Sequence, residues 1–330
     1  MGDSIQIRDF IPGDRDDEAV ARLNAVAWSA DFLDFEPPTA SDLREFDRAF
    51  DPARYTLRRF VAEEAGEVVG YAFYSHMPWA FDPRAYWASV RCDPARRGRG
   101  LGRRLYDRVM EDLTQIGAQS VRMQAREDDP IACGALSRRG FVEEVRSIEY
   151  ALDTRRVSLD EFRGYAERSA AEGFVILSLP ELRERDPDWL AKLHALHAAV
   201  VRDIPLPDEP NPERSPAALV DYLFKAPGAL PEACFIALHG DRYAGECVLY
   251  RNQDDEAALD HQVTGVDSAF RGQGLAVALK LRTIEFAQQN GFERIATWVE
   301  SNNPSMLAVN EKLGFVRGCG LIVLEKRLSP

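Results

Sequence analysis

Two glycine-containing stretches combine the residue types that a phosphate-binding loop needs. They read Arg97-Gly98-Arg99-Gly100-Leu101-Gly102 and Arg271-Gly272-Gln273-Gly274-Leu275-Ala276. Each follows a short β-like run and precedes a segment in which apolar residues recur with helical spacing. Glycine lets a backbone approach a phosphate closely, and the first N–H groups of a helix have no partner within that helix. Because the helix dipole also favours an anion there, each stretch predicts a phosphate site.

The two loops lie within longer segments that match each other. Arg97 and Arg271 are 174 positions apart, and the same offset places Gly140-Phe141-Val142 on Gly314-Phe315-Val316. The spacing from the loop arginine to the phenylalanine is 44 residues in both halves. This pattern predicts the duplication of a whole domain rather than a short repeat. Both loops read R-x-x-G-x-G/A, and the dinucleotide fingerprint G-x-G-x-x-G is absent.

These motifs resemble the GNAT superfamily of acyl-CoA-dependent N-acyltransferases. The resemblance rests on the loops and on a second motif from Asn303 to Phe315, which reads N-x-x-M-x-x-x-N-x-x-L-G-F. It extends over most of both halves, and the two fused copies are similar to the arrangement of the mycothiol synthase group. It implies an α+β fold with two GNAT-like domains, each a twisted, mostly antiparallel mixed sheet flanked by helices. It also implies acetyl-CoA as the acyl donor.

The alternation of strand-like and helix-like segments predicts where the domains divide. We expect an N-terminal domain over 1–152, a linker with a connecting helix over 153–174, and a C-terminal domain over 175–330. Phe141 to Leu152 should close the first sheet, and Phe315 to Leu328 should close the second. The acidic, proline-rich stretch from Asp203 to Pro212 should be a loop, and the resemblance places it near the acceptor entrance.

Composition limits the partners of the chain. A length of 330 residues suits two domains, and 45% hydrophobic with 29% charged residues is typical of a soluble globular protein. The net charge of −13 argues against nucleic acid, although it is compatible with a cationic amine. No apolar run is long enough to span a bilayer, and the N-terminus lacks the features of a signal peptide. The five scattered cysteines lack metal-ligand spacing, so we expect reduced thiols, no metal and a cytoplasmic location. The oligomeric state stays open.

The resemblance implies which residues hold the donor. The glycine loop should bind the pyrophosphate, and the end of the preceding strand should pair with the pantetheine arm. In the second copy these positions, with two from the distal motif, are Thr264, Gly265, Val266, Arg271, Gly272, Gln273, Gly274, Leu275, Ala276, Asn303 and Met306. In the first copy they are Val90, Arg91, Cys92, Arg97, Gly98, Arg99, Gly100, Leu101 and Gly102.

Acyl transfer to an amine needs a base, and the family often carries a carboxylate on the strand before the loop. Asp260 occupies that place, and strand alternation would put Asp260, Gln262 and Thr264 on one face. The constant offset matches Asp260 with Tyr86, which cannot act as a base near neutral pH. Glu246 and Glu300 are weaker candidates for the base.

The family usually places a tyrosine, as general acid, in the distal helix. This chain has Asn310 there and Leu136 in the first copy. Asn310 can hydrogen-bond the donor but cannot release a proton as an acid. His194 and His197, three residues apart on a predicted helix, lack further metal ligands, so we expect packing or surface roles for both.

Three hypotheses follow. The first is an acetyl-CoA-dependent N-acetyltransferase that acts on a small-molecule amine and whose catalysis resides mainly in the C-terminal domain. The second is a non-catalytic acyl-CoA-binding or sensing protein, because the tyrosine is missing in both copies. The third, a nucleic-acid-associated protein, rests on the arginine-glycine run from Arg96 to Arg104 and conflicts with the acidic charge.

Overall fold

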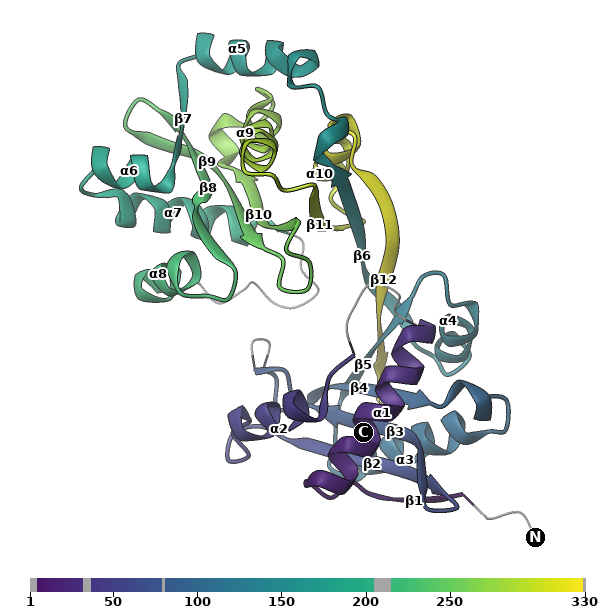
Figure 1. The fold of residues 1–330 in the computed structure, drawn as a ribbon. Helices are drawn as coiled ribbons and strands as arrows, with labels where there is room; N and C mark the ends of the chain where they lie inside the picture. The colour runs from purple at the N-terminus through teal and green to yellow at the C-terminus, as the bar shows by residue number, and fades with distance from the viewer. Residues whose placement is uncertain (1–4, 32–36, 79–80, 205–214, 329–330) are drawn as a thin grey trace. The chain divides into compact units, whose positions relative to one another are not determined.

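The computed structural model describes residues 5–31, 37–78, 81–204 and 215–328. Its contacts divide the chain into two compact units (Figure 1). The N-terminal unit comprises residues 1–144 and 321–330, and the C-terminal unit comprises residues 145–320. Both are α+β, as the sequence predicted. None of the helices in the described ranges is long and apolar enough to cross a membrane.

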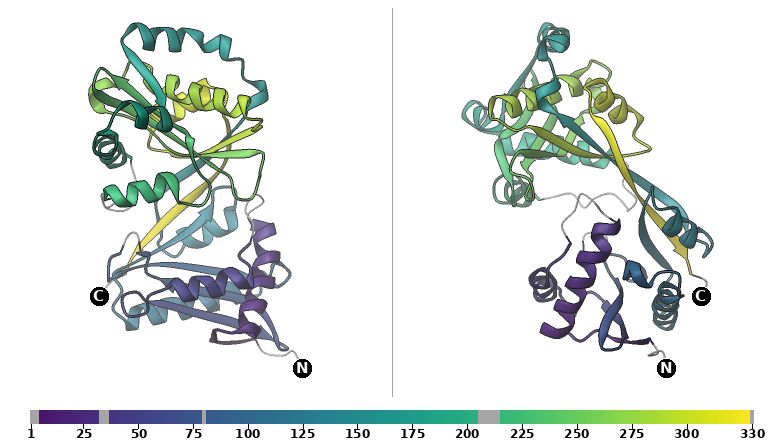
Figure 2. Two further views of the ribbon diagram at one scale, coloured as in Figure 1. Left: turned by 60° about the vertical axis from the view of Figure 1, so that its left-hand side comes forward. Right: turned by 45° about the vertical axis from the view of Figure 1, so that its right-hand side comes forward.

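The N-terminal unit is a sheet in the order β1-β2-β3-β4-β5-β12, antiparallel except for the pair β4–β5. Its helix α3 packs on one face and α1 on the other (Figure 2). The elements are β1 (Gln6–Asp9), α1 (Asp14–Asp31), α2 (Ala40–Ala49), β2 (Leu57–Glu64), β3 (Glu67–Ser75), β4 (Ala85–Cys92), α3 (Leu101–Gln115), β5 (Ser120–Arg126) and α4 (Pro130–Ser137).

The C-terminal unit repeats this plan in the order β6-β11-β10-β9-β8-β7, with β10–β11 as its parallel pair. Helices α6, α7 and α8 pack on one face of the sheet and α9 packs on the other. The elements from β6 onward are β6 (Val142–Asp153), α5 (Arg163–Ala171), β7 (Phe174–Ser178), α6 (Leu179–Arg185), α7 (Trp189–Arg202), α8 (Pro216–Phe224), β8 (Ala229–His239), β9 (Arg242–Arg251), β10 (Ala258–Val266), α9 (Leu275–Gln289), β11 (Arg294–Glu300), α10 (Pro304–Lys312) and β12 (Val316–Arg327), of which the first residues of β6 and the end of β12 belong to the N-terminal unit.

The last strand of each sheet comes from the other half of the sequence. Leu321 to Arg327, at the end of β12, pair with β5 in the N-terminal unit, and Ile322 and Leu324 are buried in its core. Ser147 to Asp153, in β6, pair with β11, and Ile148 joins the core of the C-terminal unit. This exchange differs from the division at residues 152 and 175 expected from the sequence. The strands are where the sequence predicts them, but apolar alternation does not specify which neighbour a strand pairs with.

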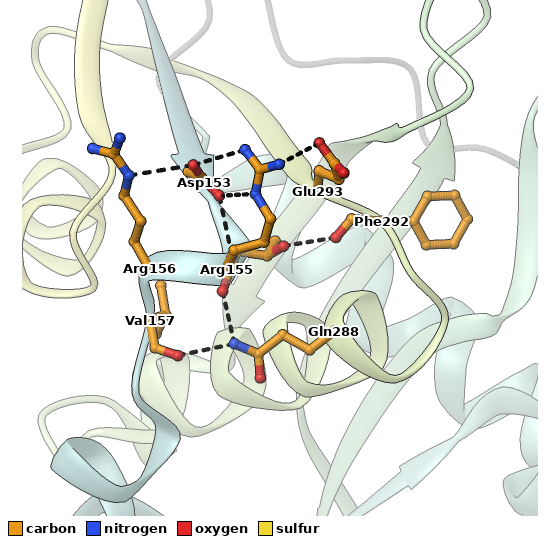
Figure 3. A network of polar contacts seen from close by, with 8 residues as sticks. Asp153, Arg155, Arg156, Val157, Gln288, Phe292 and Glu293 are labelled. Atoms are coloured by element: carbon orange, nitrogen blue, oxygen red, sulfur yellow. Dashed lines mark hydrogen bonds and ion pairs between the residues drawn. The ribbon is translucent and has the colours of Figure 1, made fainter.

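The segment that follows β6 is fixed to the C-terminal end of α9 (Figure 3). The side-chain amide of Gln288 donates to the carbonyl oxygens of Thr154 and Val157, at 2.7 and 2.9 Å. The hydroxyl of Thr154 donates to the carbonyl of Phe292 at 2.6 Å. The predicted linker is therefore anchored, and the position of α5 relative to α9 is set by these bonds.

The exchange predicts that a single substitution near the C-terminus destabilises the N-terminal unit. Leu324→Ala should lower the free energy of unfolding of that unit by about 2–5 kcal/mol, because it leaves a cavity in the core. Thermal unfolding followed by calorimetry, with hydrogen exchange to locate the loosened strands, measures this effect. Arg327→Gln, whose side chain is 83% exposed, is the control and should be neutral. Faster exchange confined to the C-terminal unit in Leu324→Ala would contradict the pairing.

Candidate functional site

The two glycine loops have the same backbone conformation. Gly98 and Gly100 have φ of 78° and 82°, and Gly272 and Gly274 have φ of 79° and 77°. Gly100 and Gly274 directly precede α3 and α9, so the unpaired N–H groups of both helix starts lie next to the loop. Positive φ at these positions requires glycine, which explains why the sequence repeats it.

In both units the parallel strands before and after the loop helix separate. The pairing of β10 with β11 ends at Asp260 and Ala296, although β10 continues to Val266. The pairing of β4 with β5 likewise ends at Trp87, although β4 continues to Cys92. A gap with unpaired backbone groups on its edges therefore opens beside each glycine loop, and such edges can accept an extended ligand.

A cleft of about 680 Å³ lies over the loop of the C-terminal unit. It contains all eleven residues of the second copy that the sequence assigned to the donor. These are Thr264, Gly265, Val266, Arg271, Gly272, Gln273, Gly274, Leu275, Ala276, Asn303 and Met306. Asn303 also caps α10, because its side chain accepts from the N–H of Met306 at 3.2 Å. The structure therefore brings these predicted residues together on one surface.

The cleft also contains residues that the sequence did not identify. Tyr165 and Arg168 come from α5, and Lys312 ends α10. Lys312 donates to the Tyr165 hydroxyl at 2.9 Å, and this hydrogen bond lowers the pKa of Tyr165. Arg271 forms an ion pair with Asp203 and also donates to the carbonyl of Val266 at 3.1 Å. Backbone N–H groups, Arg168, Arg271 and Lys312 together fit a diphosphate.

A β-bulge changes the face on which Asp260 lies. His261 pairs with Leu249 and Val263 pairs with the adjacent Val248, so Gln262 is an extra residue on β10. Asp260 pairs with Tyr250, in the core under α7 and α8. Thr264 pairs with Cys247, which packs against α9. The expectation that Asp260, Gln262 and Thr264 share a face is therefore wrong.

The bulge also corrects the match between the two copies. Trp87 is the last residue of β4 that pairs with β5, as Asp260 is the last residue of β10 that pairs with β11. The counterpart of Asp260 is therefore Trp87 rather than Tyr86. A constant offset fails here because β4 has no extra residue to match Gln262. The chemical contrast persists, because an indole is no base.

Asp260 has the environment of a base whose affinity for protons is raised. Burial raises the pKa of this carboxyl, whereas a hydrogen bond from Asn252 at 2.8 Å lowers it. Asp260 lies where the strands part and does not line the cleft itself.

The weaker candidates are both engaged with other side chains. Glu246 is buried, and its carboxylate lies 2.9 Å from Nδ1 of His197 on α7. His197 therefore packs inside the unit, one of the two roles expected for it. Glu300 accepts from the hydroxyl of Ser147 at 2.9 Å, and burial raises its pKa.

Asn310 is fully buried on α10, within one helical turn of Met306 and Val309, which line the cleft. Its side-chain oxygen accepts a hydrogen bond from Nζ of Lys280 at 2.8 Å. Lys280 lies on α9 and is only 1% exposed. The sequence gives one signal for this pair: at the 174-residue offset the first copy has Tyr106 and Leu136, which carry no charge.

In the first copy the predicted residues lie at the end of β4, in the glycine loop and at the start of α3. They are Val90, Arg91 and Cys92, followed by Arg97, Gly98, Arg99, Gly100, Leu101 and Gly102. Arg91 donates to the side-chain oxygen of Asn24 on α1 at 3.1 Å. The arginine-glycine run is thus a turn into α3 rather than an extended tract.

Comparison with known proteins identifies the family. The model of the acetyltransferase (GNAT) family matches residues 20–141 and 199–315, one match in each half. The chain belongs to the GNAT family. It is an N-acetyltransferase whose acetyl donor is acetyl-CoA, as its motifs predicted.

Proteins similar in sequence to this chain include mycothiol acetyltransferases. The protein of Amycolatopsis mediterranei (strain U-32) is 30% identical over 161 residues, which are 46% of this chain and 50% of that protein. The protein of Rhodococcus jostii (strain RHA1) is 27% identical over 266 residues, which are 79% of this chain and 80% of that protein.

Solved structures share the whole two-unit fold. A tandem GNAT protein from the clavulanic acid biosynthesis pathway aligns with a TM-score of 0.66 at 17% identity, over 99% of each chain. A GCN5-related N-acetyltransferase from Sphaerobacter thermophilus aligns with a TM-score of 0.64 at 18% identity, over 99% of this chain and 96% of that one. At these identities the likeness concerns the fold.

The cleft predicts different results for two glycines with the same backbone angle. A side chain at Gly274 would begin 3.2 Å from the ring of Tyr165, within the cleft, whereas the space around Gly291 is open. Both have φ of 77°, so Gly274→Val and Gly291→Val carry a similar backbone strain. Titration calorimetry should show CoA binding at least about tenfold weaker in Gly274→Val, and unchanged in folded Gly291→Val. Equal loss in both variants would mean that strain, rather than obstruction of the cleft, weakens binding.

Proposed function

We propose that the C-terminal unit transfers an acetyl group from acetyl-CoA to the amine of a small molecule. The nitrogen of the amine forms a bond to the acetyl carbonyl carbon, and the C–S bond of the thioester breaks. The electron pair of that bond goes to sulfur, and the proton of the amine goes to a base. The observation that supports this proposal is the combination of one cleft, a phosphate loop and a carboxylate at the point where β10 leaves β11.

The cleft residues suit the two ends of the donor. Backbone N–H groups at Gly272 and Gly274 and the start of α9 would hold the diphosphate, with charge from Arg168, Arg271 and Lys312. Thr264 to Val266, which pair with β9 but no longer with β11, would pair with the extended arm and present it to the gap.

Asp260 is the proposed base. An amine must lose its proton before it attacks, and a positioned base accelerates such a step by about 10²- to 10⁴-fold. A raised pKa brings the carboxylate nearer to the range in which it takes up a proton at neutral pH. Because Asp260 faces α7 and α8, an acceptor that binds on that face would meet it. The proline-rich loop expected at the acceptor entrance lies mostly outside the described residues.

The proposal that catalysis takes place in the C-terminal unit rests on the corrected structural alignment of the two copies. Trp87 replaces Asp260 and Leu136 replaces Asn310 in the N-terminal unit. The two units keep the same loop geometry, so both can hold a phosphate, but one of them lacks the proposed base. The relatives are named for acetylation linked to mycothiol, which favours a small-molecule amine of that general kind as the acceptor.

The assignment of Asp260 as the base predicts that its substitution in the C-terminal unit, and not a substitution in the N-terminal unit, reduces acetyl transfer. Asp260→Asn should reduce kcat/KM for acetyl transfer by about 10²- to 10⁴-fold, with CoA binding intact. Glu256→Gln, an exposed carboxylate in the same connection between β9 and β10, is the matched control, and Gly100→Trp tests the loop of the N-terminal unit. Release of free thiol from acetyl-CoA, across a panel of amines, is the measurement.

Two results would change the assignment. Loss of turnover in folded Gly100→Trp with Asp260→Asn unaffected would place the reaction in the N-terminal unit. A silent Asp260→Asn together with an inactive Glu246→Gln would make Glu246 the base. Binding of acetyl-CoA without thiol release for any amine would favour the sensing function instead.

A further inference from the structure

A cluster of six polar side chains adjoins the cleft of the C-terminal unit through Thr264. Thr264 lines the cleft and contacts Cys247, and the other five members lie on β9, β10, α9 and α10. Four of these five are among the buried polar residues of the chain, and Cys247 is buried as well. The members are Cys247, His261, Thr264, Lys280, Thr283 and Asn310.

The hydrogen bonds of this polar cluster fix the orientation of the Asn310 amide. An ammonium only donates, so the 2.8 Å contact from Lys280 must be to the oxygen of Asn310. Both N–H groups of the Asn310 amide are then left as donors, and the amide nitrogen has no hydrogen-bond partner among the described residues. A buried donor without a partner is rare in a folded protein, so a bound molecule is the natural candidate to accept from it.

The charge of this cluster resides on Lys280. The titratable groups that face it are Cys247 on β9 and His261 on β10. Burial raises the pKa of Cys247 to about 11 and lowers that of His261 well below its usual value, so both are neutral near pH 7. Burial also lowers the pKa of Lys280 to about 8, which leaves it protonated at neutral pH. The ring of Phe315, 4.8 Å from the ammonium, gives it a further favourable contact.

The N-terminal unit shows that the fold does not need this polar cluster. Each member has a counterpart at the same place in its element, such as the sixth residue of α3 for Lys280 and the seventh of α4 for Asn310. The counterparts all belong to the apolar core or pack against it: Ala72, Ala88, Val90, Tyr106, Val109 and Leu136. Burial of polar and charged groups is unfavourable, so their presence in one copy alone points to a use.

We propose that Lys280 is a positioning residue that holds the Asn310 amide with its N–H bonds directed to the thioester sulfur. The inference rests on the proposed function and names the group that assists the leaving thiolate. When the C–S bond breaks and its electron pair goes to sulfur, the Asn310 N–H groups donate to the developing thiolate. The nearby ammonium strengthens them by polarising the amide. The proton lost by the amine goes to Asp260, and the thiolate takes its own proton from solvent after release.

This arrangement accounts for the absence of a tyrosine in the distal motif. A phenol would supply a proton to sulfur, whereas an amide supplies only hydrogen bonds. Lys280 adds positive charge next to that amide without entering the cleft. A donor fixed before the reaction begins has no reorganisation to undergo when charge develops, and one such donor is worth about 10²- to 10³-fold in kcat.

The first test measures the thiol of bound CoA and needs no acceptor. Ultraviolet titration follows the thiolate of CoA on the wild type, on Lys280→Met and on Asn310→Leu. Both variants should make the bound thiol a weaker acid by about tenfold or more. Arg282→Met removes an exposed charge from the same helix and is the matched control; its bound thiol should titrate as in the wild type. If either variant fails to fold, the other carries the test.

The second test uses turnover. Lys280→Met should reduce kcat by about 10²-fold with KM for acetyl-CoA unchanged, and the double variant should lose no more than the single ones if the two residues act as a unit. The wild type should lose activity as pH rises through about 8, because Lys280 deprotonates, and Lys280→Met should lack that fall. An unchanged thiol titration in the folded variants overturns the inference. Absence of CoA binding to the wild type overturns the proposed function, and the inference with it.

Discussion

The candidate site depends on the short pairing between β10 and β11. Three residue pairs hold these parallel strands together, and beyond Asp260 and Ala296 the register ends. Side chains at the point of separation are thus close to the floor of the gap, and the part of β10 beyond that point, still paired with β9, leads to the glycine loop. The loop glycines, the start of α9 and the unpaired strand edge then line one cleft because all follow from the same separation.

Comparison of the two units distinguishes the features that the fold requires from those that the proposed chemistry requires. Both keep the short parallel pairing, the left-handed glycines and the helix that follows, so these features belong to the backbone plan. Only the C-terminal unit combines Asp260 at the separation with Lys280 and Asn310 behind it. At the same places the N-terminal unit has Trp87, Tyr106 and Leu136. Since the scaffolds agree, the difference reflects what the side chains do rather than what the backbone requires.

Local motifs predicted much of this site, and pairing between distant segments limited the rest. The loop positions follow from glycine spacing and from one strand that precedes one helix, and the resemblance to the family implied the other predicted cleft residues. The face of Asp260 was mispredicted because the extra residue at Gln262 leaves no mark in a pattern of alternation. Tyr165 and Arg168 were missed because their role depends on how Gln288 anchors the linker. Lys280 was missed because a lysine in a helix is ordinarily exposed.

The exchange of strands explains why a half without the proposed base can persist in the chain. The sheet of the C-terminal unit is completed by β6, which begins at Val142 and follows the N-terminal elements in sequence. Removal of residues before Phe174 would expose the edge of β11 and the core around Ile148. The N-terminal unit in turn obtains Ile322 and Leu324 from the end of β12. Each half therefore needs a segment encoded beside the other, so a copy that lacks the proposed base is still required by the fold of its neighbour.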